Sequence, residues 1–397
     1  MHEPTRDRQN QAVCIAVNND RASIYMDHFV HVLVNCQFTA QFPLVATALL
    51  PILDANEHLR SIAVAIGALD ASRRAQVGTH HPLHPSARVV AFTNYQRALA
   101  RLQGELDSSQ APLRDDVLWT TFLLGLFELM SEPSGDRWAR HMLYGTGKLL
   151  QFADMSCKPS PLKQMLFDAF QVLEANRAIM YGVDTFLSEH RWEVMRRTLF
   201  LSTRQGGDLP MDEMTSLMIY TASFSKRFFD QIDQIPESER HTHPSIKRLG
   251  LEGIGVQHML ERWYSQHDTT INARHASNES QLALLYYHTL LLFLSRNYTY
   301  YPCWSAKATP SLDPSAIVRH TKSISALIDA LLRSSYVPGV MLLFSLRVVG
   351  SLADETDLRS RLLTQLDTIY WKGYVVAERV KVDLNELWAL NNTHPVC

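Results

Sequence analysis

The chain has 397 residues, a formal net charge of −2, and 46% hydrophobic and 20% charged residues, which is ordinary for a globular protein with a continuous core. Its basic residues occur as isolated pairs, Arg73-Arg74, Arg196-Arg197 and Lys226-Arg227, and form no basic stripe. Since contacts from several Lys or Arg to phosphates supply most non-specific DNA affinity, we expect the chain to bind nucleic acid poorly on its own.

No segment suggests export or membrane insertion. Residues 1–19 are largely polar and charged and contain no apolar segment of the length that a signal peptide needs, so no signal peptide is predicted, and residues 1–20 are expected to form a polar tail. The longest strongly apolar run, residues 282–294, is shorter than the ~20 residues that span a bilayer. This run therefore predicts a buried helix, and no contact with a membrane is expected.

Apolar residues recur with the helical period in almost every segment, which predicts an all-α fold. Residues 315–335 show this well, because Asp313 suits the cap position, Pro314 suits the first turn and Pro338 lies just beyond the end. The loops between such segments are short and rich in Pro, Gly, Ser and His, and none suits a long flexible linker. We therefore expect residues 21–397 to form a single large domain of many packed antiparallel helices.

Residues 115–150 predict a pair of helices, separated by the break at 133–135. Glu128 lies on the first helix and His141 on the second, and the apolar faces of the pair must meet, so these two side chains are placed to contact each other. A buried carboxylate is costly without a partner, and an imidazolium would supply one. The residues alone fit a structural network and a catalytic acid–base pair equally well.

Several short segments outside this helical pair follow one another in a characteristic order across residues 21–390. They are Tyr25, His28-Phe29, Phe42-Pro43-Leu44, Leu50-Pro51, Leu59-Arg60, Gly67-Ala68-Leu69, Tyr95–Leu99, Leu346–Gly350, Gly373–Ala377 and Trp388. Together with the pair, and in this order and spacing, they resemble the fungal-specific transcription factor domain found downstream of a binuclear zinc cluster. The resemblance implies a helical regulatory domain that acts in the nucleus, associates with itself through helices and senses a metabolite. It also implies a structural role for Glu128 and His141.

The zinc cluster that usually accompanies this domain needs six closely spaced cysteines as thiolate ligands. The present chain has five, scattered without a CxxC pair, at Cys14, Cys36, Cys157, Cys303 and Cys397. We therefore predict no zinc cluster in this chain. The scattered, odd number of cysteines also fits a reducing compartment better than a disulfide framework.

Three motifs suggest a binding site but have a better explanation. His80-His81-Pro82-Leu83-His84 lies in a loop between prolines without an acidic partner nearby, and His241 and His243 add a second pair. This pattern favours a solvated loop over a metal site. Gly145-Thr146-Gly147-Lys148 has Met142 and Leu149 where a phosphate loop requires Gly and Ser or Thr. Small residues that allow close helix approach explain it better, and Gly253-Ile254-Gly255 is likewise no phosphate loop.

Two further groups of residues have a functional and an ordinary interpretation. Asp115-Asp116 resembles half of a terpene-cyclase metal motif but lacks the third acidic residue, and acidic side chains also favour a helix start. Tyr286-Tyr287-His288, Arg347 and Trp371 place polar groups in apolar segments, as small-molecule pockets do and as ordinary cores do. The ordinary interpretation is preferred for both, so no catalytic residue, metal ligand or cofactor is predicted, and the ligand-binding residues are left open.

The sequence thus predicts a transcriptional regulator-like protein rather than an enzyme. This regulator would control a metabolic or secondary-metabolite pathway from the nucleus. It would pair as a homodimer or as a heterodimer with a zinc-cluster transcription factor, or sense a small-molecule metabolite. The alternative is a cytoplasmic accessory enzyme of secondary metabolism, a cyclase or isomerase on the same scaffold. Its acid–base candidates would be Glu128, His141, Tyr287 and His288.

Overall fold

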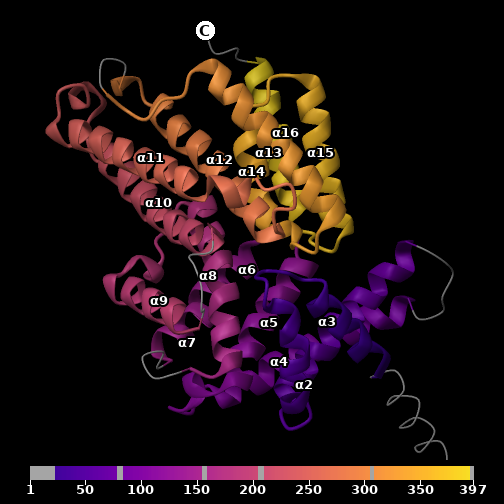
Figure 1. Cartoon of the computed structure of the whole chain (residues 1–397). Coiled ribbons are helices and arrows are strands. Elements are labelled where there is room, and N and C mark those ends of the chain that lie inside the picture. Colours follow the sequence, from indigo (N-terminus) through magenta and orange to yellow (C-terminus); the bar gives the residue numbers. More distant parts are fainter. Residues whose placement is uncertain (1–22, 78–83, 154–158, 204–209, 305–307, 394–397) are drawn as a thin grey trace, which may run out of the picture. The chain divides into compact units, whose positions relative to one another are not determined.

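The computed structural model describes residues 23–77, 84–153, 159–203, 210–304 and 308–393 (Figure 1). Over these ranges the regular secondary structure is helical and includes no strand, which confirms the predicted all-α fold. None of the helices in these ranges is long and apolar enough to cross a membrane. The predicted tail at 1–20 and most of the histidine-rich segment, 80–83, lie outside the described residues.

The helices cluster into two compact units, and the first comprises the residues up to Phe167 together with Gly373–Val376. It begins with a helical stretch at residues 23–34. Its further elements are η1 (Phe42–Leu44), α2 (Val45–Leu53), α3 (Glu57–Val77), α4 (His84–Glu105), η2 (Ala111–Leu113), α5 (Asp115–Ser131), α6 (Asp136–Arg140), η3 (His141–Thr146), α7 (Gly147–Phe152) and the start of α8 (Pro161–Tyr181).

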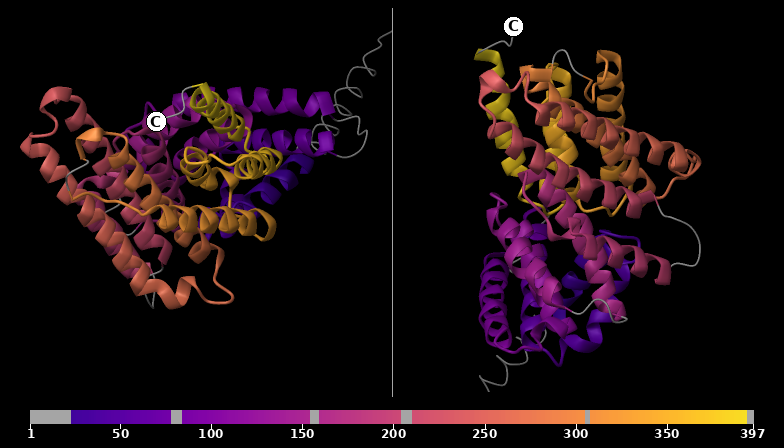
Figure 2. Two further views of the ribbon diagram at one scale, coloured as in Figure 1. Left: turned by 90° about the horizontal axis from the view of Figure 1, so that it is seen from above. Right: turned by 90° about the vertical axis from the view of Figure 1, so that its left-hand side faces the viewer.

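Helix α5 is the central element of the first unit. Every residue from Asp116 to Met130 is buried, as expected for a helix that is apolar on all sides. It packs against α3, α4, α6 and η3, whose ribbons surround it in the indigo and purple part of the chain (Figures 1 and 2). The predicted helical pair is therefore present, with Gly135 at a φ of 76° in the break. Glycine adopts this left-handed conformation without steric cost.

The second unit comprises Asp168–Lys372 and the residues from Ala377 onward. Helix α12 (Asn278–Thr299) is its centre and packs against α10, α11, α13 and α14. The other elements are η4 (Phe186–Ser188), α9 (His190–Thr203), α10 (Pro210–Asp233), η5 (Glu237–Glu239), α11 (Pro244–Ile271), η6 (Pro302–Trp304), α13 (Pro314–Ser334), η7 (Gly339–Leu342), α14 (Leu343–Gly350), α15 (Thr356–Trp371) and α16 (Ala377–Thr393).

Two sequence predictions for the second unit are confirmed. Residues 282–294 lie inside α12, and this helix is buried along most of its length. Helix α13 begins at Pro314, and the Asp313 side chain accepts a hydrogen bond of 2.8 Å from the backbone N–H of Ala316. An acidic cap with proline in the first turn thus starts the helix as its sequence indicates.

Candidate functional site

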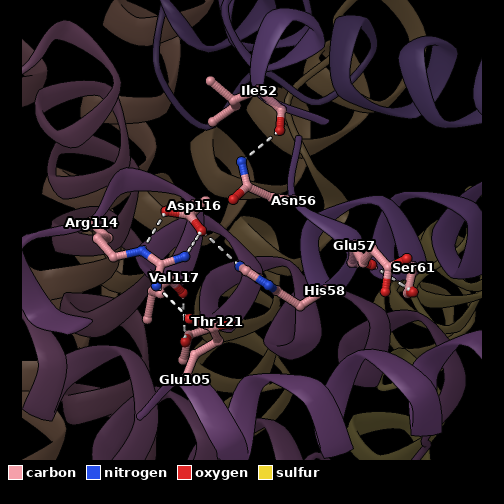
Figure 3. A network of polar contacts seen from close by, with 10 residues as sticks. All are labelled: Ile52, Asn56, Glu57, His58, Ser61, Glu105, Arg114, Asp116, Val117 and Thr121. Atoms are coloured by element: carbon pink, nitrogen blue, oxygen red, sulfur yellow. Dashed lines mark hydrogen bonds and ion pairs between the residues drawn. The ribbon is translucent and has the colours of Figure 1, made fainter. Parts of the chain in front are cut away.

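A network of charged side chains fixes the segment between α4 and α5 within the first unit (Figure 3). His58 Nε2, from α3, lies 2.9 Å from Asp116 Oδ2, at the start of α5. Arg114 donates from Nε to Asp116 Oδ1 over 3.2 Å and from Nη2 to Oδ2 over 2.5 Å. Its Nη1 also pairs with Glu105, at the end of α4. One guanidinium therefore joins the two ends of the connection that contains η2.

The environment of Asp116 keeps this carboxylate charged. Burial alone would raise its pKa, but the hydrogen bonds from His58 and Arg114 and their positive charges outweigh burial and hold the pKa of Asp116 well below its ordinary value. The Asp115-Asp116 pair is thus the start of α5, as preferred from the sequence. Asp115 differs from its neighbour, because its side chain accepts a hydrogen bond of 2.6 Å from the Ser160 hydroxyl.

Beside this network lies a pocket of about 640 Å³, a size typical of small-molecule sites. Its walls come from the last turns of α4, the connection to α5, α5 itself, and the helical run η3–α7. The lining residues are Leu99, Leu102, Gln103, Leu106, Ser108, Ser109, Ala111, Pro112, Thr121, His141, Tyr144, Gly145, Lys148, Leu149 and Phe152. About half of these side chains are apolar, and the polar ones among them are Gln103, Ser108, Ser109, Thr121, His141 and Lys148. Sites that bind organic ligands likewise combine apolar walls with polar groups.

Two aromatic side chains of η3 and α7 stand out among the lining residues. Tyr144 is 66% exposed and Phe152 is 73% exposed. Leu106, on the opposite wall, is also more exposed than a leucine in a core. The pocket therefore offers apolar surface to solvent that a ligand would cover.

His141 connects the pocket to a buried acid. Its Nδ1 lies 3.5 Å from Glu128 Oε2, and the Tyr95 hydroxyl donates a hydrogen bond of 2.6 Å to Glu128 Oε1. This confirms that Glu128 and His141 meet across the helical pair. Sequence reasoning missed Tyr95 as the third member, although it lies in a segment that carried the family resemblance.

Helix η3 is a π-helix, a wider turn that is uncommon and frequently found at functional sites. A buried Thr in an α-helix usually satisfies its hydroxyl on the carbonyl four residues earlier, as Thr121 does with Val117 at 2.9 Å. The buried Thr146 hydroxyl in the π-helix has no hydrogen-bond partner among the described residues. Three further buried atoms near this turn also make no hydrogen bond there, namely Glu128 Oε2, His141 Nε2 and Trp138 Nε1. Such a group of unsatisfied polar atoms is unusual in a protein interior.

Gly145 explains how η3 comes so close to α5. A Cβ at this position would lie 3.1 Å from His141 Cδ2 and 3.2 Å from Thr121 Cγ2. The segment Gly145–Lys148 is helical and holds small residues at this contact, as the sequence indicated. Lys148, at the end of this segment, is one of the residues that line the pocket.

The other candidate residues belong to the second unit and form no common site there. Tyr286 is an ordinary core tyrosine, which donates to Met341 O at 2.8 Å and accepts from Asn176 at 2.9 Å. Arg347 pairs with Asp383, and Trp371 is 67% exposed. Gly253 lies inside α11, where it makes room for Tyr298.

His288 lies against His320, with their Nδ1 atoms 2.8 Å apart, and its neighbour Tyr287 stacks on Tyr264. Burial and the neighbouring His320 lower the pKa of His288 to about 3. Both imidazoles are therefore neutral at physiological pH. Within the described ranges no group of three or more His, Cys, Asp or Glu is placed to hold a metal ion, and His243 instead caps α11.

Comparison with known proteins agrees with the resemblance seen in the sequence. The family model of the fungal specific transcription factor domain matches residues 23–397. Neither the curated proteins nor the solved structures contain a match. Because the family match spans nearly the whole chain, including both units and the pocket, the chain belongs to the fungal specific transcription factor domain family, a family of transcription regulators.

Proposed function

We propose that the chain is a regulator of transcription that responds to a small organic metabolite bound in the pocket of its first unit. The observation that carries this proposal is the pocket of about 640 Å³, which is apolar over most of its wall. His141 lies at one side of it, on a π-helix with unsatisfied polar groups. A ligand that contacts η3 would act on a turn whose polar atoms are not fully paired, and such a turn can change its hydrogen bonding at low cost.

DNA contact would come from a partner in this proposal. The five cysteines lack the close spacing that a zinc cluster needs, and the net charge of the chain is −2, so in this proposal the chain itself does not hold the phosphate backbone. A zinc-cluster transcription factor paired with this chain in the nucleus would supply the contact. The regulated genes would then belong to one metabolic or secondary-metabolite pathway.

The test is a fungal host that lacks the gene, complemented with designed variants. Ser109→Trp places an indole at the exposed pocket wall, and Ser238→Trp places the same side chain in the exposed η5 of the second unit, which contributes no residue to this pocket. Transcripts of neighbouring and pathway genes should fall in the deletion strain. Wild type and Ser238→Trp should restore them, whereas Ser109→Trp should leave them unresponsive to the pathway metabolites.

One observation favours a second candidate function, an accessory enzyme of the cyclase or isomerase type. The Tyr95–Glu128–His141 contacts place an acid–base chain at the pocket wall, as proton-transfer chemistry requires. In that case transcripts would hold in the deletion strain while one intermediate accumulates. Glu128→Gln and His141→Gln would then abolish its turnover without unfolding the protein, and intact turnover in both variants excludes the enzyme.

A further inference from the structure

The charge balance of the pocket wall is positive. Lys148, on α7, is the one permanently charged residue among those that line the pocket, and no carboxylate lines it. Among the described residues the Lys148 ammonium has no ion pair or hydrogen bond. The lysine is therefore available to a ligand.

The described acidic groups around this wall are not among the residues that line it. Glu105 pairs with Arg114, whose remaining nitrogens bind Asp116 (Figure 3). Glu128 lies behind His141 and accepts the hydrogen bond from Tyr95. Asp107 is exposed in the connection to η2 and is not a lining residue. A negative ligand at Lys148 thus meets no unpaired carboxylate among the pocket-lining residues.

The rest of the pocket is suited to an apolar body. Leu99 and Leu102 line it from α4, and Leu149 lines it from α7. The exposed rings of Tyr144 and Phe152 flank the lysine along the helical run. Covering such rings removes apolar area from water, which stabilises a complex.

We propose that this pocket binds an amphipathic monocarboxylic acid. Its carboxylate pairs with Lys148, and its apolar body packs on Leu99, Leu102 and Leu149. A single lysine suits a carboxylate better than a phosphate dianion, which is usually held by several donors or a helix N-terminus. A cationic ligand would be repelled by the same ammonium. This inference names the ligand class for the proposed function and rests on it.

The test measures binding to the full chain by titration calorimetry, with three probes that share one apolar body: biphenylacetate, biphenylacetamide and biphenylethylamine. We expect the acid to bind roughly fivefold to tenfold tighter than the amide, because one charge-assisted hydrogen bond in a partly exposed site adds about that much affinity. The amine should bind weakest. Lys148→Met, which keeps the apolar stem, should remove the preference for the acid, and Lys148→Arg should keep it. Lys322→Met, at an exposed position on α13, is the matched control and should change nothing.

Different results separate the ligand class from the existence of a site. If acid and amide bind equally and Ser109→Trp abolishes both, the pocket binds small molecules but the carboxylate assignment is wrong. If the acid is preferred and Lys148→Met keeps that preference, the lysine has no such role and the proposal is overturned. If no probe binds and Ser109→Trp leaves the transcript response intact, the ligand class and the proposed function fail together.

Discussion

His58 and Asp116 form a buried pair inside the first unit, with Nε2 and Oδ2 2.9 Å apart and only 6% and 10% of the two side chains exposed. Arg114 shares the same carboxylate but is 36% exposed. The pair joins α3 to the first turn of α5, and Arg114 extends it to the end of α4. This arrangement holds the segment that forms one wall of the pocket.

Asp116→Asn should therefore destabilise the chain by about 2–3 kcal/mol at pH 7. Breaking a fully buried ion pair costs about 3–5 kcal/mol, and the exposure of Arg114 reduces this through solvent screening. The measurement is urea unfolding followed by tryptophan fluorescence. Asp54→Asn is the control, because the Asp54 side chain is 89% exposed and lies 3.9 Å from Arg60; it should change the free energy of unfolding very little.

The cost of Asp116→Asn should also depend on pH. The folded-state pKa of Asp116 lies below its ordinary value of 3.8, so its contribution to stability is present above that value and is lost as the pH falls through the folded-state pKa. Wild type and variant should differ fully at pH 7 and converge in stronger acid. A difference that grows on acidification would contradict the assigned direction of the shift.

Cys36 should be inert to alkylation in the folded protein. Its thiol is buried, contacts the Tyr374 hydroxyl at 3.3 Å, and has its pKa raised to about 12 by burial, whereas the thiolate is the reactive form. Iodoacetamide at pH 8 should leave the Cys36 peptide unmodified in mass spectrometry, and urea should expose it to rapid reaction. Fast modification without urea would show that the contact between Cys36 and Tyr374 opens in the native state.

Mild acid should weaken the second unit through His288. Its pKa is lowered to about 3 by burial and by His320, and the pKa of His320 is itself lowered by burial and by Arg319. A depressed folded-state pKa means that the unfolded chain binds the proton first, so stability is present above about pH 6.5 and falls as the pH drops towards 3. The loss should approach roughly 1 kcal/mol for each pH unit below pH 6.

A His288→Leu variant isolates this effect. Its free energy of unfolding should vary less between pH 7.5 and pH 5 than that of wild type, measured by urea unfolding at each pH. His190→Leu removes an imidazole whose side chain is 88% exposed and should leave the wild-type pH dependence in place. Equal pH dependence in the wild type and the His288→Leu variant would show that His288 takes up its proton without cost to the fold.

The helices could be predicted because their signals are local. Asp313 and Pro314 start α13, and the break at 133–135 separates α5 from α6, as the residues themselves indicate. The contact between Glu128 and His141 also followed from a local pattern, since two helices joined by a short loop must bring their apolar faces together.

The pocket could not be predicted in the same way. The residues from 106 to 112 lie in a short connection without periodicity. Their position depends on Arg114 reaching Glu105 across the connection and on Asp116 pairing with His58 of α3, and the second of these is a tertiary contact. The π-helix at His141–Thr146 leaves no recognisable pattern in the sequence either. The role of Lys148 in lining the pocket likewise depends on residues far from it in the sequence, such as Leu99 and Leu102 of α4.

Two glycines of α11 provide a matched test of the packing in the second unit. A Cβ at Gly253 would lie 2.1 Å from the Tyr298 hydroxyl and 2.8 Å from Pro310 Cγ, whereas a Cβ at Gly255 would have nothing within 4 Å. Tyr298 is buried and donates a hydrogen bond of 2.6 Å to Leu249 O. Gly253→Ala must displace this ring and break that bond, so it should destabilise the chain by about 2 kcal/mol or more. Gly255→Ala should stabilise it by about 0.5–1 kcal/mol, because alanine loses less backbone entropy in a helix.

Both variants are compared with wild type in one series of urea unfolding curves. Since helix propensity acts equally at the two sites, the difference between them measures the space at Gly253, and equal shifts would show that Tyr298 does not occupy it.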